Sequence, residues 1–261
     1  MTGSVLLAAA AAVVVLMLGT WLLSLVWHDA SIVDPVWPLG FVVIAWVTRV
    51  VASGHGLPAR QWIIVAMTTI WGLRLSGYLA WRKHGAPEDP RYQAMRRHWG
   101  DRFPLMSLLT VFALQGALMW IVSLPVQLGQ VRDTPDLGVL AFVGIALWLV
   151  GVTFETVGDA QLARFKADPA SAGQVMDRGL WRYTRHPNYF GDTCVWWGIA
   201  LVAAETGIGA IGIVGAVVMT VLLVRVSGVP MLERSMAKRR PGYTEYVART
   251  SAFIPRPPRR D

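Results

Sequence analysis

Five ionisable side chains lie inside, or at the edge of, long apolar stretches of this sequence. They are Asp34, Arg74, Tyr78, Glu155 and Asp192. An ionisable group in the hydrocarbon layer of a membrane is costly unless it faces a cavity or a partner, so such groups are candidates for function. The chemistry of the protein is therefore sought first at these five positions.

Arg74 and Tyr78 are four residues apart, so on a helix they share one face with Trp71 and Trp81. That face is suited to a pocket that has one charge, one phenol and aromatic walls. It is equally suited to a packed helix interface in which Arg74 pairs with a carboxylate of another apolar stretch. The spacing alone leaves both interpretations open.

Asp34 lies in the run 31–38 (SIVDPVWP), directly before a proline. Proline suits the first turn of a helix and aspartate is a common capping residue, so this position also has the features of a helix start. Capping and a functional carboxylate are both compatible with the sequence here.

A second polar group follows the fifth apolar stretch. Glu155, Asp159 and Lys166 lie near one side of the helix as it ends, and the run 179–192 (GLWRYTRHPNYFGD) leads into the next stretch. Cations can bind phosphates, carboxylates can accept hydrogen bonds from ribose hydroxyls, and flat rings can stack on a base, so this set is suited to a nucleotide. The alternative is a solvated belt of charge beside the membrane. No GxGxxG motif follows a strand, which excludes a Rossmann site.

The composition indicates which elements position these residues. Of the 261 residues, 54% are hydrophobic and 15% are charged, whereas soluble globular domains carry about 25% charged residues. This excludes disorder, a fibrous repeat and most water-soluble enzymes. Apolar runs near the length that spans a bilayer predict membrane helices. The seven runs are 5–27, 35–53, 61–80, 104–128, 136–157, 188–204 and 207–227.

We therefore predict an all-α, polytopic membrane protein with about seven transmembrane helices, which form a single domain over 1–261. The first run lacks a basic segment before it and is long for a signal peptide, so we expect it to be a retained span. The charges then predict the orientation. Of the 24 Lys and Arg residues, 20 lie in the loops 81–103 and 158–187 and in the tail from Arg225. The positive-inside rule places these segments in the cytoplasm and the N-terminus outside.

Other classes of site are not indicated. The single Cys194 has no partner for a disulfide or a CxxC motif, and the five His residues show no metal-ligand spacing. The formal net charge of +8 is accounted for by the cytoplasmic segments of a membrane protein. We accordingly expect membrane lipids as partners, no metal and no nucleic acid.

The run 179–192 resembles the C-terminal signature of the steroid 5-alpha-reductase and sterol C14-reductase superfamily, and most of all its bacterial membrane branch. The segments 158–169 (GDAQLARFKADP), 242–247 (GYTEYV) and 253–255 (FIP) also match. In the N-terminal half, only 31–34 (SIVD), 71–75 (WGLRL) and 88–92 (EDPRY) are typical of that branch. Isoprenylcysteine-type carboxyl methyltransferases share the short RHPxY motif and a similar FIP ending.

The resemblance implies seven helices around a pocket, with NADPH entering from the cytoplasm and a lipid-like enone from the bilayer. It implies that the protein lies in the bacterial inner membrane and that the cofactor motifs are concentrated in 150–255. The cofactor-binding residues carried over from the family are Glu155, Asp159, Lys166, Tyr183, Arg185, His186, Asn188, Asp192 and Tyr246. The family's catalytic Glu falls near Asp34. Its Tyr partner falls near Tyr78, and Arg74 is the other candidate for that position.

These residues predict an NADPH-dependent membrane oxidoreductase that acts on CH–CH groups. The expected reaction is reduction of a carbon–carbon double bond conjugated to a carbonyl, in a steroid-like or other lipid substrate. Tyr78 would donate a hydrogen bond to the carbonyl oxygen as it gains charge, and Asp34 would orient that phenol or hold its own proton. The first alternative is a membrane methyltransferase that uses S-adenosylmethionine, and the second is a lipid- or sterol-binding scaffold. The loop 158–187 holds five cations, which favours a phosphate-bearing dinucleotide.

Overall fold

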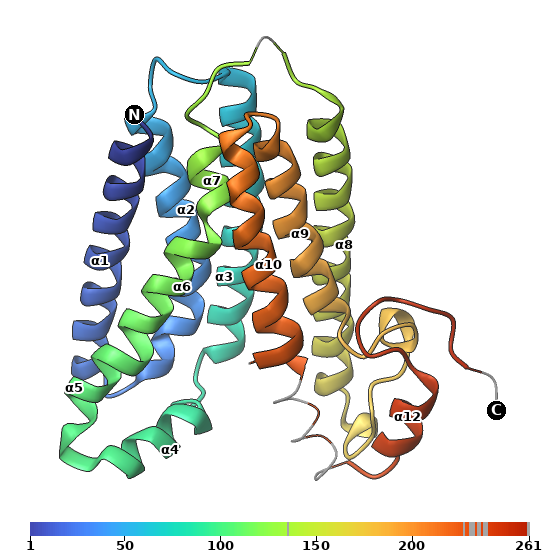
Figure 1. Ribbon diagram of the computed structural model, residues 1–261. Helices are drawn as coiled ribbons and strands as arrows, with labels where there is room; N and C mark the ends of the chain where they lie inside the picture. Colours follow the sequence, from blue (N-terminus) through green and yellow to red (C-terminus); the bar gives the residue numbers. More distant parts are fainter. Residues whose placement is uncertain (135, 227, 230–232, 234–235, 237–239, 260–261) are drawn as a thin grey trace. The chain divides into compact units, whose positions relative to one another are not determined.

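The computed structural model describes residues 1–134, 136–226, 228–229, 233, 236 and 240–259, and all regular elements in this part of the chain are helical (Figure 1). Six segments among these residues are long and apolar enough to cross a membrane. They are α1 (Thr2–Val26), Ala30–Val51, α3 (Pro58–Lys83), Pro90–Val122, α8 (Val139–Ala167) and Ile208–Val226. The prediction of an all-helical, polytopic membrane protein is confirmed.

The seventh predicted span, 188–204, is also a helix, α9 (Pro187–Ala204). It has 18 residues and carries Asn188 and Asp192 in its first turns, and it is not among the six apolar segments. The sequence therefore placed a helix correctly at each of the seven runs, but one of them is shorter and more polar than an ordinary membrane helix. Of the tail cations, Arg234, Lys238, Arg239 and Arg260 lie outside the described residues.

The chain forms two compact units, 1–142 with 199–215 and 143–198 with 216–261. Each is described by itself, and the single domain over 1–261 stays a prediction. In the first unit, α2 (Val33–Val51) packs against α1 and α3. Gly72 permits a close approach to α2, because a Cβ at this position would lie 2.6 Å from a Val42 methyl and 2.9 Å from the Pro38 carbonyl oxygen.

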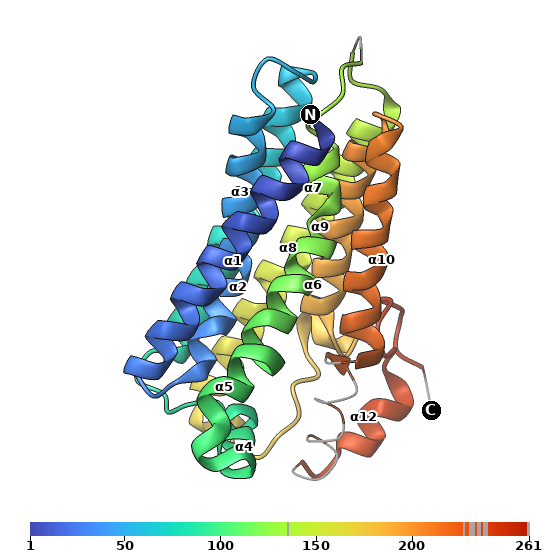
Figure 2. The ribbon, with the colours of Figure 1, turned by 60° about the vertical axis from the view of Figure 1, so that its left-hand side comes forward.

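The predicted helix 104–128 is interrupted. α4 (Pro90–Trp99) ends at Gly100, whose φ of +50° favours glycine, and α5 (Phe103–Ser107) follows. A π-helical stretch (Leu108–Ala113), α6 (Leu114–Val122) and α7 (Leu124–Leu128) complete the segment. α6 lies against α1, where the Trp120 indole donates a hydrogen bond of 3.0 Å to the Leu6 carbonyl (Figure 2).

In the second unit, α8 and α9 touch through glycines. A Cβ on Gly151 would lie 2.6 Å from the Gly191 carbonyl oxygen, and one on Gly191 would lie 2.5 Å from the Gly151 carbonyl oxygen. Because small residues let helix backbones approach closely, this contact brings the polar residues of the two helices together. The remaining helices of the C-terminal part are α10 (Ile213–Val221), a π-helical stretch (Leu222–Val226) and α12 (Tyr243–Arg249).

Candidate functional sites

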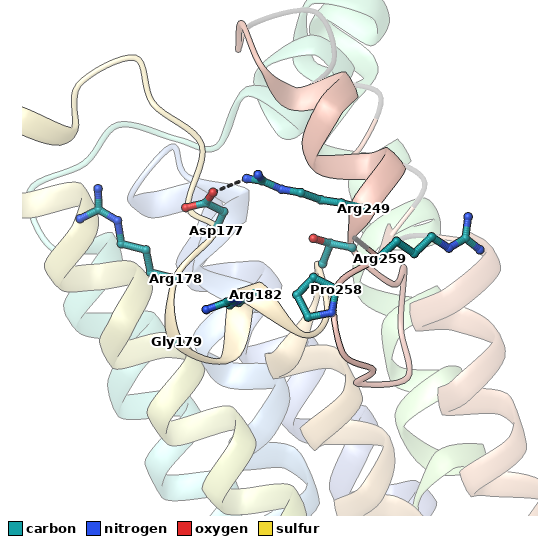
Figure 3. A pocket seen from close by; sticks show the side chains of 8 residues that line it. Asp177, Arg178, Gly179, Arg182, Arg249, Pro258 and Arg259 are labelled. Carbon is teal, nitrogen blue, oxygen red and sulfur yellow. Dashed lines mark hydrogen bonds and ion pairs between the residues drawn. The ribbon is translucent and has the colours of Figure 1, made fainter. Parts of the chain in front are cut away.

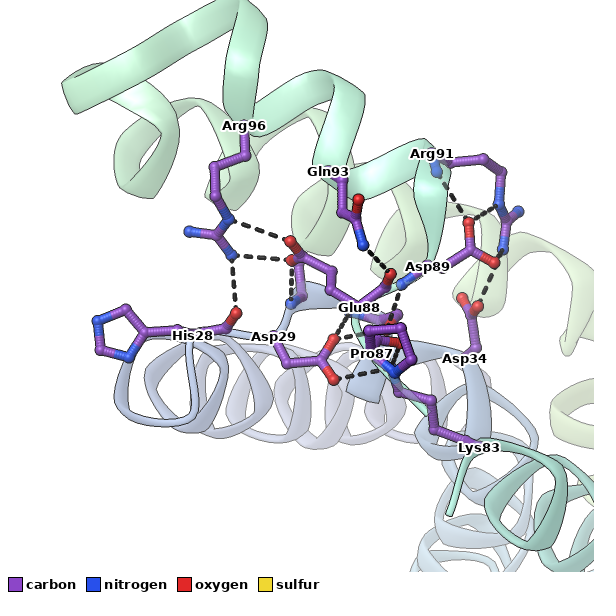
Figure 4. A network of polar contacts seen from close by, with 12 residues as sticks. His28, Asp29, Asp34, Lys83, Pro87, Glu88, Asp89, Arg91, Gln93 and Arg96 are labelled. Atoms are coloured by element: carbon purple, nitrogen blue, oxygen red, sulfur yellow. Dashed lines mark hydrogen bonds and ion pairs between the residues drawn. The ribbon is translucent and has the colours of Figure 1, made fainter. Parts of the chain in front are cut away.

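Asp34 lies in the first turn of α2, and both of its carboxylate oxygens accept hydrogen bonds from side chains of α4, of which Figure 4 shows the one from Arg91. The Tyr92 hydroxyl donates to Oδ1 at 2.8 Å, and the Arg91 guanidinium donates to Oδ2 at 3.0 Å. Tyr92 is 6% exposed, and its hydroxyl in turn accepts a bond of 3.3 Å from the Gln115 amide. These partners come from another helix, so the contacts of Asp34 are those of a tertiary network and differ from those of a helix cap.

The chain just before Asp34 is fixed to the segment before α4. The Glu88 carboxylate accepts a bond of 2.8 Å from the Ala30 amide, and the Ser31 hydroxyl accepts one of 3.2 Å from the Asp89 amide (Figure 4). Arg96 pairs with Glu88 at 2.8 Å. The motifs 31–34 and 88–92 are therefore one structural feature, which holds Asp34 and Tyr92 in register.

Asp29 and Lys83 form a neighbouring ion pair with an N–O distance of 2.8 Å. Burial raises the pKa of Asp29, but hydrogen bonds from Lys83 and Ser31 outweigh it and leave the pKa below its usual value. The Asp29 carboxylate therefore stays charged at neutral pH. Together with Asp34 and Arg82, Lys83 lines an open polar pocket of about 270 Å³, close to the lower end of the ~300–1,000 Å³ range of ligand sites.

Tyr78 and Arg74 share a face of α3, as their spacing predicted. The Arg74 guanidinium lies 5.9 Å from the centroid of the Tyr78 ring, and that of Arg82 lies 5.8 Å from the same centroid. Trp81 packs beside Tyr78 at 5.9 Å between centroids. Asp34 accepts a hydrogen bond from the phenol of Tyr92, and the expected pairing of Asp34 with Tyr78 stays a prediction. The catalytic roles assigned to Tyr78 and Arg74 stay predictions.

In the second unit, α8 and α9 bring four of the predicted cofactor residues together. Glu155 and Asp159 on α8 are 3% and 4% exposed, and Asp192 on α9 is 7% exposed. The Asn188 amide donates a hydrogen bond of 3.3 Å to Asp159. Such burial of carboxylates is rare unless they serve as partners or as a site, so this cluster is the strongest functional candidate in the unit.

Arg185 and His186 form a second cluster with Glu233. Oε1 of Glu233 lies 2.8 Å from Nε of Arg185 and 3.1 Å from Nε2 of His186. Burial raises the pKa of Glu233, but its bonds to His186 and Arg185 outweigh this and lower the pKa to about 2. The Arg185 guanidinium also donates to the Thr250 carbonyl at 2.6 Å, so this side chain is held from two directions.

A pocket of about 160 Å³ lies beside these residues. Four of the predicted cofactor residues line it, namely Lys166, Arg185, His186 and Tyr246. The Tyr246 hydroxyl donates a bond of 2.5 Å to the Trp181 carbonyl, and burial raises the pKa of Tyr246 well above its usual value. This phenol therefore acts as a neutral donor that fixes the aromatic wall.

The last predicted residue, Tyr183, is 43% exposed and does not line this pocket. The nine predicted residues thus divide into a buried α8–α9 group, a pocket-lining group and Tyr183. Among the described residues, no group of three or more His, Cys, Asp or Glu is arranged to hold a metal ion.

Sequence reasoning missed Tyr92, Arg91 and Glu233 as site residues. Tyr92 and Arg91 end the motif 88–92, whose agreement with the family pattern was a signal that could have identified them. No local motif marks Glu233, because its partners are 47 and 48 residues away in the chain.

Comparisons with known proteins give one family and one relative. The model of a family described as "Protein of unknown function (DUF1295)" matches residues 20–250. An uncharacterized protein of Schizosaccharomyces pombe, C594.04c, is 23% identical over 270 residues, which covers 90% of this chain and 75% of the relative. No solved structure matches the chain.

Proposed function

Since the chain belongs to the DUF1295 family, which lies in the steroid 5-alpha-reductase-like group, we propose that it is an NADPH-dependent membrane oxidoreductase. Its reaction is the reduction of a carbon–carbon double bond conjugated to a carbonyl in a lipid-like substrate. The proposal includes membership of the bacterial membrane branch of this group, because the sequence resembles the motifs of that branch. It also includes an N-terminus outside the cell and cytoplasmic basic loops.

Two observations in the C-terminal unit carry the proposal together, namely the buried α8–α9 cluster and the pocket with aromatic walls. Asp159, with Asn188 bonded to it, supplies acceptors suited to ribose hydroxyls. Lys166 and Arg240 line the pocket and supply cations suited to phosphates, and Trp181 supplies a flat ring. The residues present therefore fit a nucleotide. The pocket of about 160 Å³ has room for one part of NADPH, since whole ligands occupy ~300–1,000 Å³.

Asp159, Asn188 and Lys166 would hold NADPH, which would supply a hydride to the β-carbon of the enone, and a proton from water would complete the reduction at the α-carbon. Negative charge then develops on the carbonyl oxygen, which requires a donor aimed at it. Tyr92 is the phenol suited to that task. In the structure its proton is directed at Asp34. When Asp34 is protonated, the carboxyl group can donate to the phenol oxygen, and the phenol proton becomes available to the substrate.

One observation favours keeping the methyltransferase as the second candidate. The preference for a dinucleotide rested on the five cations of 158–187, but only Lys166 and Arg185 of these line the pocket, and Arg185 is bonded to Glu233. Arg178 and Arg182 line a different pocket. S-adenosylmethionine has no phosphates and needs fewer cations, so both cofactors belong in any test.

The proposal is tested with purified protein, NADPH and a panel of enone lipids, including a steroid enone, an isoprenoid enone and an unsaturated acyl enone. We expect NADPH oxidation to be matched mole for mole by a product two mass units heavier than the substrate. Transfer of a methyl group from S-adenosylmethionine to a lipid thiol or carboxylate, with no NADPH oxidation in any arm, would overturn it.

A further inference from the structure

A second pocket, of about 590 Å³, lies in the C-terminal unit and is lined mainly by arginines (Figure 3). Its walls come from the loop after α8, from the end of α12 and from the chain that follows α12. The lining residues are Asp177, Arg178, Gly179, Arg182, Arg249, Thr250, Pro258 and Arg259. No role has been assigned above to any of its four arginines.

The charges of this Arg-lined pocket are unbalanced. Among the described residues Asp177 is the one carboxylate in the lining, and it forms an ion pair with Arg249 (Figure 3). Arg178, Arg182 and Arg259 are left without a carboxylate partner among the described residues. Like charges gathered around one cavity repel each other and attract an anion to it. The pocket therefore has the electrostatics of an anion site.

The backbone of the pocket is held in place. Arg259 donates its amide hydrogen to the Arg249 carbonyl at 3.0 Å, and Arg256 donates to the Tyr183 carbonyl at 2.9 Å. On the opposite wall, the Leu180 amide donates to the Gln161 side chain at 2.9 Å. Gly179 has a φ of +58° and no space for a Cβ beside Gln161. Because these bonds fix the walls, the backbone of the cavity is preformed, which lowers the cost of binding.

The Arg-lined pocket is separate from the aromatic pocket assigned to the cofactor. The two share no lining residue, although both use the segment 174–186. Asp177, Arg178 and Arg182 of this segment line the first, whereas Trp181 and Arg185 line the second. A ligand of the Arg-lined pocket therefore contacts a different set of side chains from a ligand of the aromatic pocket.

We propose that the Arg-lined pocket binds a phosphate group, carried either by an anionic phospholipid headgroup or by a free phosphate ion. A guanidinium presents donors in a planar fork that matches two phosphate oxygens, and several such forks around one cavity suit a group with three or four oxygens. A single carboxylate ligand would leave most of these donors unused. Arg182 and Arg249 contact the phosphate, with Asp177 holding Arg249, and the exposed Arg178 and Arg259, whose guanidinium groups point to opposite sides in Figure 3, turn toward it on binding. The inference does not depend on the proposed reductase activity.

The test uses the purified full chain in a neutral detergent, with the melting temperature followed as each probe is added. The probes are short-chain phosphatidylglycerol, short-chain phosphatidylcholine, inorganic phosphate and NADPH. The R178Q/R182Q variant removes two lining charges. Its matched control is R97Q/R102Q, which removes two exposed charges that do not line the pocket. A second variant, R178K/R182K, keeps the charges but removes the forks, and it replaces the glutamine pair if that pair does not fold.

We expect a saturable rise in melting temperature with phosphatidylglycerol or with inorganic phosphate, and a weaker one with phosphatidylcholine. The arm that responds identifies the source of the phosphate. The apparent affinity should fall at least about tenfold in R178Q/R182Q and stay within about twofold in the control pair. No saturable rise in either arm, or an equal loss in both pairs, would overturn the site. A loss of NADPH binding in R178Q/R182Q without a loss of phosphate binding would assign the pocket to the cofactor instead.

Discussion

The hydroxyl of Tyr92 lies 2.8 Å from Oδ1 of Asp34, although the two residues are 58 positions apart in the sequence. The contact joins the first turn of α2 to the first turn of α4, and the amides and side chains of 30–31 and 88–89 hold the two segments in register. A carboxylate and a phenol fixed in this way can together direct a proton toward a polar atom of a substrate.

Replacing Asp34 separates a catalytic role from a structural one. We expect both Asp34→Asn and Asp34→Ala to lower turnover about 10²–10³-fold, since neither can supply a carboxyl proton to Tyr92. Tyr92→Phe should produce a loss of similar size. NADPH binding should be retained in all three variants. The matched control is Asp101→Asn, at an exposed position. Wild-type NADPH oxidation by Asp34→Asn would leave this residue with a purely structural role.

The α8–α9 cluster should determine cofactor affinity. Asp159→Ala and Asn188→Ala each remove a partner from a partly buried hydrogen bond, worth about 1–3 kcal/mol. We expect the NADPH dissociation constant to rise about 5- to 150-fold in each variant, measured by titration of the purified protein. Glu245→Ala, at an exposed position on α12, is the control and should bind as the wild type does. Unchanged affinity in both variants would remove this cluster from the cofactor site.

Gly191 should tolerate no side chain. A Cβ there would lie 2.5 Å from the Gly151 carbonyl oxygen and 2.7 Å from the Glu155 amide nitrogen, so Gly191→Ala must force α8 and α9 apart. We expect a loss of stability of about 1–3 kcal/mol together with weaker NADPH binding, because Asp159 and Asn188 sit on the separated helices. Gly77→Ala is the control, since nothing lies within 4 Å of its Cβ position. A melting temperature of Gly191→Ala equal to that of the control would contradict the close contact.

Glu205 makes the stability of the first unit depend on pH. Its carboxylate pairs with the fully buried Arg60 at 3.2 Å and accepts a bond of 2.9 Å from the Ala141 amide. Burial raises the pKa of Glu205, but the bonds from the Ala141 and Gly138 amides and from Arg60 outweigh it, so the folded-state pKa is lowered. A carboxyl group with a lowered pKa stabilises the fold when the pH is above the pKa of that group in the unfolded chain. This contribution is lost as the pH falls through the pKa of the group in the folded protein.

We therefore expect the wild type to lose more stability than Glu205→Gln between pH 7 and acidic pH below about 4.5. At pH 7, Glu205→Gln should cost about 3–5 kcal/mol, because it leaves Arg60 buried without its counter-charge. Melting temperatures of both proteins across this range provide the measurement, and Glu245→Gln is the control at an exposed carboxylate. Parallel curves for the wild type and Glu205→Gln would refute the assignment.

The proposed orientation is tested with single cysteines after Cys194 has been replaced. Gln93 is a poor labelling site, because its amide donates a bond of 2.6 Å to the Glu88 carbonyl. Ala94→Cys, which is exposed, is the better choice, and Ser53→Cys reports on the loop at the other end of α3. We expect a membrane-impermeant reagent to label position 53 in intact cells and position 94 only after permeabilisation. The reverse pattern would invert the topology.

The positions of the helices could be predicted from the sequence because each apolar run is close to the length that a bilayer requires. The breaks within 104–128 could not, since Ser123 and Pro125 interrupt a run that remains apolar throughout. The proximity of Asp159 and Asn188 depends on the close contact between Gly151 and Gly191, which the spacing of the two motifs does not reveal. The contact between Asp34 and Tyr92 could not be predicted from the sequence. Helical periodicity identifies neighbours on one helix, but it carries no information on which other segment packs against that helix.

We propose above that the C-terminal unit binds NADPH. The sharpest test is the thermal stabilisation of the purified protein by NADPH, by NADH and by S-adenosylmethionine, measured side by side. A ligand at 100 times its dissociation constant stabilises the folded state by about 2.7 kcal/mol. We expect a rise in melting temperature with NADPH and a smaller rise or none with S-adenosylmethionine. The rise with NADPH should be lost in the double variant Asp159→Ala/Asn188→Ala. A rise with S-adenosylmethionine and none with NADPH would contradict it.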